Sequence, residues 1–178
     1  MMLNVAYPKW LNFILFQSIW FAAILGQDML EWLIVLLLVV HLTLCPDLKN
    51  ELKVILPCAA IGIIADTMLT FAGFFIFDPA PSILPIPLWL IGIWLGFVGT
   101  FRHSMSYLLA KPAIAIPASM VAAPLSYLAG VKLGAVSFGF DTAFTIVIVG
   151  LLWAFMMALF IRIDRAHQRS SSSKFALV

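Results

Sequence analysis

Charged residues are scarce in this sequence: Asp, Glu, Lys and Arg make up only 10% of it, against 64% hydrophobic residues. Soluble domains average about 25% charged and about 45–50% apolar residues. A soluble fold of 178 residues has too little interior to bury this much apolar surface, so we expect the lipid bilayer to be the solvent for most of it. The formal net charge is only +2 and the basic residues form no continuous patch, which argues against nucleic acid as a partner.

Cysteine is also rare, with Cys45 and Cys58 flanking one short polar segment. We expect both thiols to be reduced and unpaired, and to act as small packing residues. The sequence contains no phosphate-binding loop, nucleophile elbow, HExxH motif or paired-cysteine motif. It therefore assigns no catalytic and no cofactor-binding residue, and it leaves both the cofactor and the question of enzymatic activity open.

Long hydrophobic runs dominate what is present. There are six of them, at residues 10–25, 29–45, 54–77, 88–109, 112–137 and 142–163. Each is close to the ~20 residues that a helix needs to cross ~30 Å of hydrocarbon. The runs show no alternating pattern of the kind that barrel strands require, so helices are the element that satisfies their backbone in lipid. We therefore predict an all-α, polytopic membrane protein: a six-transmembrane-helix bundle over residues 1–165 and a flexible cytoplasmic tail over residues 166–178.

The distribution of Lys and Arg orients this bundle. With the N-terminus inside, Lys132 falls outside and the other basic positions fall inside: Lys9, Lys49, Lys53, Arg102, Lys111, Arg162, Arg165, Arg169 and Lys174. Cytoplasmic loops carry such an excess, so we predict that both termini are cytoplasmic. The segment 77–87 contains four prolines, and we expect it to be an outer loop without a regular helix.

Small residues recur at helical spacing on several runs. The fifth run has one at every fourth position: Ala118, Ala122, Ser126, Gly130 and Gly134. The third run places Ala59, Gly62, Asp66, Thr70 and Gly73 on a single face. Such stripes let another helix approach closely in lipid, and plain packing of the bundle is the default interpretation of each.

Asp66 is the most informative residue, because it lies near the middle of the third run. A carboxylate at the bilayer centre costs at least ~2.5–3.5 kcal/mol, so we expect Asp66 to face the bundle interior. It is then either a substrate or proton site, or a structural hydrogen-bonding group. Arg102 in the fourth run lies deep enough to pair with Asp66, but it can also reach toward cytosolic phosphates.

The histidines of the second and fourth runs add further polar groups. His41 and His103 are expected at nearly the same depth, with His103 facing into the bundle. Together with Asp66 they offer the donor types of a metal site, but their spacing matches no known motif and we predict no metal. The alternatives are simple hydrogen bonding and, for His103, a proton relay with Asp66.

The fifth run carries Pro124, Ser126 and Tyr127 at about the depth of Asp66. Pro124 removes the usual hydrogen bond to the carbonyl of Met120, so this level is rich in polar groups. We therefore predict a midplane pocket, although proline kinks are also common in spans that have no such role. The candidate ligand-binding residues are Asp66, Arg102, His103, Ser126, Tyr127, Thr70 and His41.

Four stretches carry a family resemblance: "WLNFILFQSIWFAAILG", "IGIIADTMLTFAGFF", "PLWLIGIWLGFVGTFRHSMSYL" and "APLSYLAGVKLGAVSF". Over roughly residues 8–165 the chain resembles a bacterial inner-membrane family known as domain of unknown function 2878. The most specific pieces are the pair His103–Ser104 and the pattern Pro124–Tyr127–Gly130–Gly134. The resemblance implies a Gram-negative inner-membrane protein of unassigned activity, with an associational hint of lipid metabolism.

These observations predict a small integral protein of the bacterial inner membrane that binds or transports an amphipathic, lipid-like small molecule in a midplane pocket. One alternative is a membrane-embedded enzyme or accessory subunit in lipid modification, with His103 as acid or base and Asp66 orienting it. Another is a structural subunit of a membrane complex. The expected partners are membrane lipids, an amphipathic ligand, and either another membrane protein or a second copy of the chain.

Overall fold

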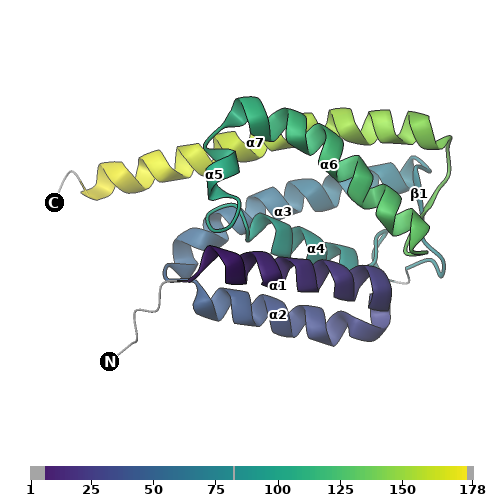
Figure 1. Ribbon diagram of the computed structural model, residues 1–178, viewed down its shortest axis with the longest axis horizontal. Helices are drawn as coiled ribbons and strands as arrows, with labels where there is room; N and C mark the ends of the chain where they lie inside the picture. Colours follow the sequence, from purple (N-terminus) through teal and green to yellow (C-terminus); the bar gives the residue numbers. More distant parts are fainter. Residues whose placement is uncertain (1–6, 82, 176–178) are drawn as a thin grey trace.

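The computed structural model describes residues 7–81 and 83–175, with side chains through residue 168. It is an elongated bundle whose long helices run along a common direction (Figure 1). The helices are α1 (Lys9–Phe21), α2 (Glu31–Leu44), α3 (Leu48–Phe71), α4 (Leu88–Val98), α5 (Ser106–Leu109), α6 (Pro112–Lys132) and α7 (Thr142–Phe175). A π-helical turn η1 (Ala22–Gly26) and a 3₁₀ turn η2 (Gln27–Leu30) join α1 to α2, and two short strands are β1 (Phe75–Ile76) and β2 (Ser137–Phe138).

Within the described residues, four helical stretches are long and apolar enough to cross a membrane: Lys9–Leu44, Leu48–Phe71, Pro112–Lys132 and Thr142–Gln168. The first of these folds back on itself through η1 and η2, so that α1 and α2 lie side by side as a hairpin (Figure 1). Large apolar side chains cover the outside, for example Trp32, which is 64% exposed, and Phe155, which is 68% exposed. The chain is therefore a mostly helical protein with membrane-like spans, as its composition predicts.

The fourth predicted span, residues 88–109, is not one helix. α4 contains only 11 residues, and turns separate it from α5. The carbonyl of Thr100 accepts hydrogen bonds from the backbone N–H groups of His103 at 3.1 Å and Met105 at 2.9 Å. These bonds satisfy the backbone without continuing the helix. Arg102 and His103 therefore lie on a loop rather than on a helix face.

The two ends of the bundle differ. Figure 1 shows the start of α1, the end of α2, the start of α3 and α5 toward one end, which we call the α5 end, and β1 at the other. β1 and β2 pair antiparallel, with Phe75 opposite Phe138. The described residues of 78–87 form no regular helix or strand, as the prolines predict. α7 continues to Phe175, and so extends as a helix into the segment beyond residue 165 that the sequence predicts to be a flexible tail.

Helices α6 and α7 have the most extensive contact of any two elements in the described part of the chain. A Cβ atom added at Gly150 of α7 would lie only 2.7 Å from the carbonyl oxygen of Met120. Pro124 cannot donate the usual helical hydrogen bond to that carbonyl. The backbone of α7 thus passes directly against the part of α6 where the helix lacks one bond.

The start of α3 is stabilised by Asp47. Its Oδ2 accepts from the side-chain amide of Asn50 at 2.6 Å, and its Oδ1 accepts from the backbone N–H of Asn50 at 3.2 Å. These two bonds, the side-chain one first, hold the pKa of Asp47 below its usual value. A lowered folded-state pKa means that the stabilisation is complete above the unfolded pKa of about 3.9 and is lost as the pH falls through the folded value.

We therefore expect Asp47→Ala to lower the free energy of unfolding by about 0.5–2 kcal/mol at pH 7, the usual cost of losing an N-cap. The deficit should shrink as the pH falls below the unfolded pKa of about 3.9 and then through the lower pKa of folded Asp47, because the carboxylate is then protonated in both states. Measuring the unfolding of the wild type and of Asp47→Ala in the same detergent, at pH 7 and at a pH below about 3.9, checks this. A deficit that stays constant across this range would show that Asp47 does not act through its charged form.

Candidate functional site

Asp66 lies in the interior of α3 and is only 1% exposed. Its Oδ1 accepts a hydrogen bond from the hydroxyl of Tyr127 on α6 at 2.7 Å. Its Oδ2 accepts one from the indole N–H of Trp94 on α4, also at 2.7 Å. The prediction that Asp66 faces polar groups inside the bundle is confirmed, and the carboxylate links three helices.

Of the two alternatives that the sequence left open for Arg102, the pairing with Asp66 does not occur. Arg102 lies instead near α7, where its Nε is 4.0 Å from Oδ1 of Asp164. The reason is that the turns after α4 place Arg102 toward the α5 end, while two uncharged donors already satisfy Asp66. The sequence did not indicate Asp164, because it directly follows the last apolar run and resembles an ordinary polar residue beyond a span.

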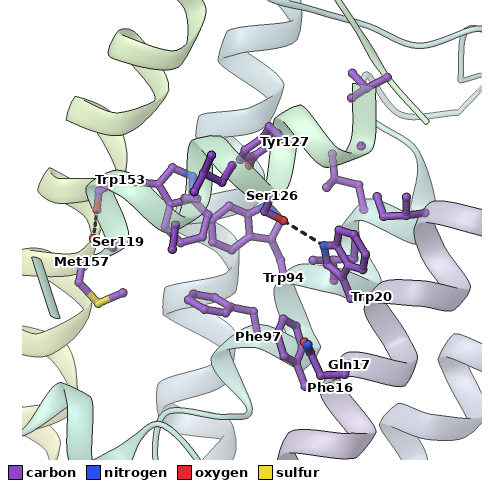
Figure 2. A pocket seen from close by; sticks show the side chains of 18 of the residues that line it. Phe16, Gln17, Trp20, Trp94, Phe97, Ser119, Ser126, Tyr127, Trp153 and Met157 are labelled. Atoms are coloured by element: carbon purple, nitrogen blue, oxygen red, sulfur yellow. Dashed lines mark hydrogen bonds between the residues drawn. The ribbon is translucent and has the colours of Figure 1, made fainter. Parts of the chain in front are cut away.

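A cavity of about 570 Å³ lies between α1, α4, α6 and α7 (Figure 2). Its walls are mainly aromatic and aliphatic. Trp94 and Trp153 stack with ring centroids 5.0 Å apart, and Phe75 stacks on Tyr127 at 4.8 Å. These rings form a rigid apolar surface, because close-packed aromatic pairs have little rotamer freedom.

The small-residue stripe of α6 faces this cavity. Ala118, Ala122, Ser126 and Gly130 all line it. The spacing of the stripe predicts a close helix–helix contact. Instead, α7 packs on another face of α6, near Met120 and Gly150. The stripe therefore leaves open space instead of admitting a neighbouring backbone.

One hydrogen bond crosses between the two walls of the cavity. The indole N–H of Trp20 on α1 donates to Oγ of Ser126 on α6 at 3.0 Å, as Figure 2 shows. Phe21 and Leu125 also line the cavity and are 51% and 57% exposed, so the cavity reaches the outer surface between α1 and α6. Gln17 contributes an amide to the same lining.

The predicted site residues separate into two places. Ser126 and Tyr127 line the cavity, and Asp66 lies behind it, reached through Trp94 and Tyr127. The hydroxyl of Thr70 donates to the carbonyl of Asp66 at 2.8 Å, within α3 and outside the cavity lining. Three further predicted residues lie toward the α5 end: His41, Arg102 and His103.

At that end, Asn12 of α1 organises a buried polar cluster. It is 2% exposed, and its Nδ2 donates to the carbonyl of Gly99 at 3.2 Å and to the hydroxyl of Tyr7 at 3.3 Å. Its Oδ1 accepts from the backbone N–H of Ser104 at 3.1 Å and from the Ser104 hydroxyl at 2.6 Å. One amide thus fixes the loop after α4 against the start of α1.

The two histidines belong to the same cluster. The rings of His41 and His103 lie 5.7 Å apart, which confirms that they share a depth. Nδ1 of His41 is 2.9 Å from the hydroxyl of Tyr7, whose pKa is raised by burial. Nε2 of His103 is 3.3 Å from Oε1 of Glu51, and the side chain of Glu51 is only 6% exposed.

Sequence reasoning missed Glu51, Tyr7 and the part played by Asn12 and Cys45. Glu51 lies in the polar segment between the second and third runs, where a carboxylate is normally solvated. The signal for Glu51 is its position in the first turn of a helix that follows a short turn. From there its side chain can face back toward the end of the previous run. His41 and Cys45 lie four positions apart, the spacing at which neighbouring side chains meet on a helix, and this is a further signal of a joint site.

The fold and these two sites define a class of protein: a mostly helical bundle with membrane-like spans, an aromatic cavity between its helices and a buried polar cluster toward the α5 end. The model of the family described as "protein of unknown function (DUF2878)" matches residues 9–159, so the chain belongs to this family, as its resemblance predicted. No curated protein and no solved structure matched the chain in the other two comparisons.

Proposed function

We propose that this protein binds or transports an amphipathic, lipid-like molecule in the bacterial inner membrane. The molecule would occupy the cavity between α1, α4, α6 and α7. The observation that carries this proposal is the cavity itself, about 570 Å³ of space walled by aromatic rings. Small-molecule sites typically have volumes of about 300–1,000 Å³ and are mainly apolar with a few polar groups.

The arrangement of the helices supports a multi-pass orientation with both termini cytoplasmic. The segments α1, α2, α3, α4 with α5, α6 and α7 run alternately between the two ends of the bundle (Figure 1). The basic residues concentrate near the α5 end, for example Lys9, Lys53 and Lys111, whereas Lys132 lies at the end of α6 toward the other. In this proposal the short helix α4, the turns after it and α5 together make the fourth crossing, and the excess of basic residues supports a cytoplasmic position of the α5 end.

The lining indicates how such a ligand would lie. An apolar chain would pack among the rings of Trp94, Trp153 and Phe97, where it would replace water or lipid at little cost. The amide of Gln17 and the hydroxyl of Ser126 are the polar groups that a carbonyl or hydroxyl of the ligand would meet. Entry from the bilayer would pass between Phe21 and Leu125, which are half exposed.

Filling the cavity should weaken binding strongly. Ala118 lines the cavity, and Ala118→Trp places an indole where the ligand would lie. We expect the amount of lipid-like molecule retained on the purified protein to fall by roughly tenfold or more, since losing about 1.4 kcal/mol of binding free energy is already tenfold. Native mass spectrometry of the protein with its retained molecules measures this.

The matched control is Ala113→Trp, on the same helix but exposed and outside the cavity lining. It should retain as much bound molecule as the wild type. Equal retention in the wild type and in Ala118→Trp would contradict the proposal, and so would the absence of any specifically retained molecule in the wild type.

A further inference from the structure

A chain of four metal-ligand atoms runs through the polar cluster at the α5 end. Nε2 of His41 lies 3.7 Å from Sγ of Cys45, and Sγ of Cys45 lies 3.6 Å from Nε2 of His103. Nε2 of His103 lies 3.3 Å from Oε1 of Glu51. Ligand atoms of His41, Cys45 and Glu51 also lie within 4.8 Å of one another.

These separations match the edges of a tetrahedral metal site. With Zn–S near 2.3 Å and Zn–N near 2.0–2.1 Å, a tetrahedral angle puts nitrogen and sulfur about 3.6 Å apart. The same angle puts nitrogen and a carboxylate oxygen about 3.4 Å apart. Three of the six edges of such a tetrahedron already have these lengths, and a bound ion would draw the remaining pairs, His41 and Glu51 among them, closer together.

The surroundings of His41 have the form that metal-bound histidines require. Its Nδ1 faces the hydroxyl of Tyr7 at 2.9 Å, which leaves Nε2 directed at Cys45. Histidine ligands usually bond an outer partner through their second nitrogen, which fixes the ring and its tautomer. Asn12 holds Tyr7 in turn, at 3.3 Å.

The cluster is also buried, and Gly99 leaves room for the ring of His41. His41 is 4% exposed, Glu51 5% and Cys45 9%. A Cβ at Gly99 would lie 2.7 Å from Nε2 of His41, so a residue larger than glycine at this position would displace the imidazole ring. Burying a thiol, two imidazoles and a carboxylate together is costly unless they pair with one another or bind a metal.

We propose that His41, Cys45, Glu51 and His103 form a binding site for a divalent transition-metal ion of the zinc type. Thiolate and imidazole ligands favour such ions over Mg²⁺ or Ca²⁺. Four protein ligands make a closed site, which is the form of structural rather than catalytic zinc. The ion would join the end of α2, the first turn of α3 and the loop after α4, and the thiol of Cys45 would release its proton to solvent on binding.

The site is independent of the proposed ligand cavity, since none of its four residues lines that cavity. Its role would be to fix the cytoplasmic end of the bundle, where α4 ends early and regular helix no longer holds the chain. The sequence offered His41 and His103 but paired them with Asp66, whereas the carboxylate that joins them is Glu51.

The test uses the purified full-length protein, freed of metal with a chelator and titrated with Co²⁺ as a spectroscopic substitute for Zn²⁺. We expect one Co²⁺ per chain, with the visible absorption of a tetrahedral site and the charge-transfer band of a cobalt–thiolate bond. Cys45→Ser should remove the charge-transfer band and weaken binding at least tenfold. Glu51→Gln, which keeps the size of the side chain, should weaken binding while retaining that band.

The matched controls are Cys58→Ser, at the other buried free cysteine, and His167→Gln, at a histidine that contacts Asn50. Both should bind Co²⁺ as the wild type does, with the charge-transfer band intact. The proposal is overturned if the wild type binds no stoichiometric Co²⁺ or Zn²⁺, or if Cys45→Ser and Cys58→Ser bind it equally well.

Discussion

Replacing Asp66 with alanine is expected to lower the free energy of unfolding by about 2–6 kcal/mol, because it leaves two buried donors without acceptors at about 1–3 kcal/mol each. These donors are the indole N–H of Trp94 and the hydroxyl of Tyr127, which both bond the carboxylate at 2.7 Å. For a chain of this size the midpoint of thermal unfolding should fall by roughly 5–20 °C. Thermal unfolding in detergent, followed by tryptophan fluorescence, measures the shift.

Two further variants locate the cause. Asp66→Asn keeps one acceptor oxygen and nearly the same volume, so we expect a smaller loss than for alanine. Asp28→Ala removes an exposed carboxylate and should change the free energy of unfolding by no more than about 0.5 kcal/mol. If Asp66→Ala unfolds at the wild-type temperature, the carboxylate does not hold α3, α4 and α6 together.

Replacing Gly62 with alanine should also destabilise the bundle strongly. A Cβ at this position would lie 2.3 Å from ring atoms of Trp94, which is only 2% exposed and stacks on Trp153. The stacking on Trp153 and the bond to Asp66 oppose a shift of the indole, and overpacking of this kind typically costs about 1–3 kcal/mol. Any shift of the ring would also lengthen its bond to Asp66, one turn further along α3, and add to the loss.

The same substitution at Gly130 is the matched control. A Cβ there would meet Val136 at 3.5 Å and Ile24 at 3.7 Å, which are ordinary contact distances. Since alanine is also the better helix former, we expect Gly130→Ala to be neutral or slightly stabilising. Equal effects of the two substitutions on the unfolding midpoint would show that the contact between Gly62 and Trp94 is not tight.

The inward position of Asp66 could be predicted because its reason is energetic and local. A carboxylate in the middle of an apolar run has no cheaper place than the bundle interior, whatever the fold. Its partners could not be predicted, since Trp94 and Tyr127 are 28 and 61 residues away along the chain. Arg102 was the obvious partner by charge, but the turns after Val98 carry it out of reach.

The stripe of α6 is the opposite case. The regular pattern could be seen in the sequence, but what the stripe faces could not be predicted from it. Spacing alone places Ala118, Ala122, Ser126 and Gly130 on one face. Whether that face meets a helix or a cavity depends on which side α7 takes, and α7 takes the side where Gly150 meets Met120. A small-residue face with no helix against it becomes open space.

Composition and hydrophobic run lengths were sufficient to establish a helical, membrane-type chain, to define the apolar segments and to mark Asp66 as an inward-facing group, because these follow from the cost of exposing polar groups to hydrocarbon. Three features depend instead on contacts between distant segments. They are the end of α4 after 11 residues, the separation of the cavity from the His41–His103 cluster, and the presence of Glu51 and Cys45 in that cluster. Such contacts form only when whole helices pack, and local patterns such as the spacing of His41 and Cys45 can hint at them but do not specify them.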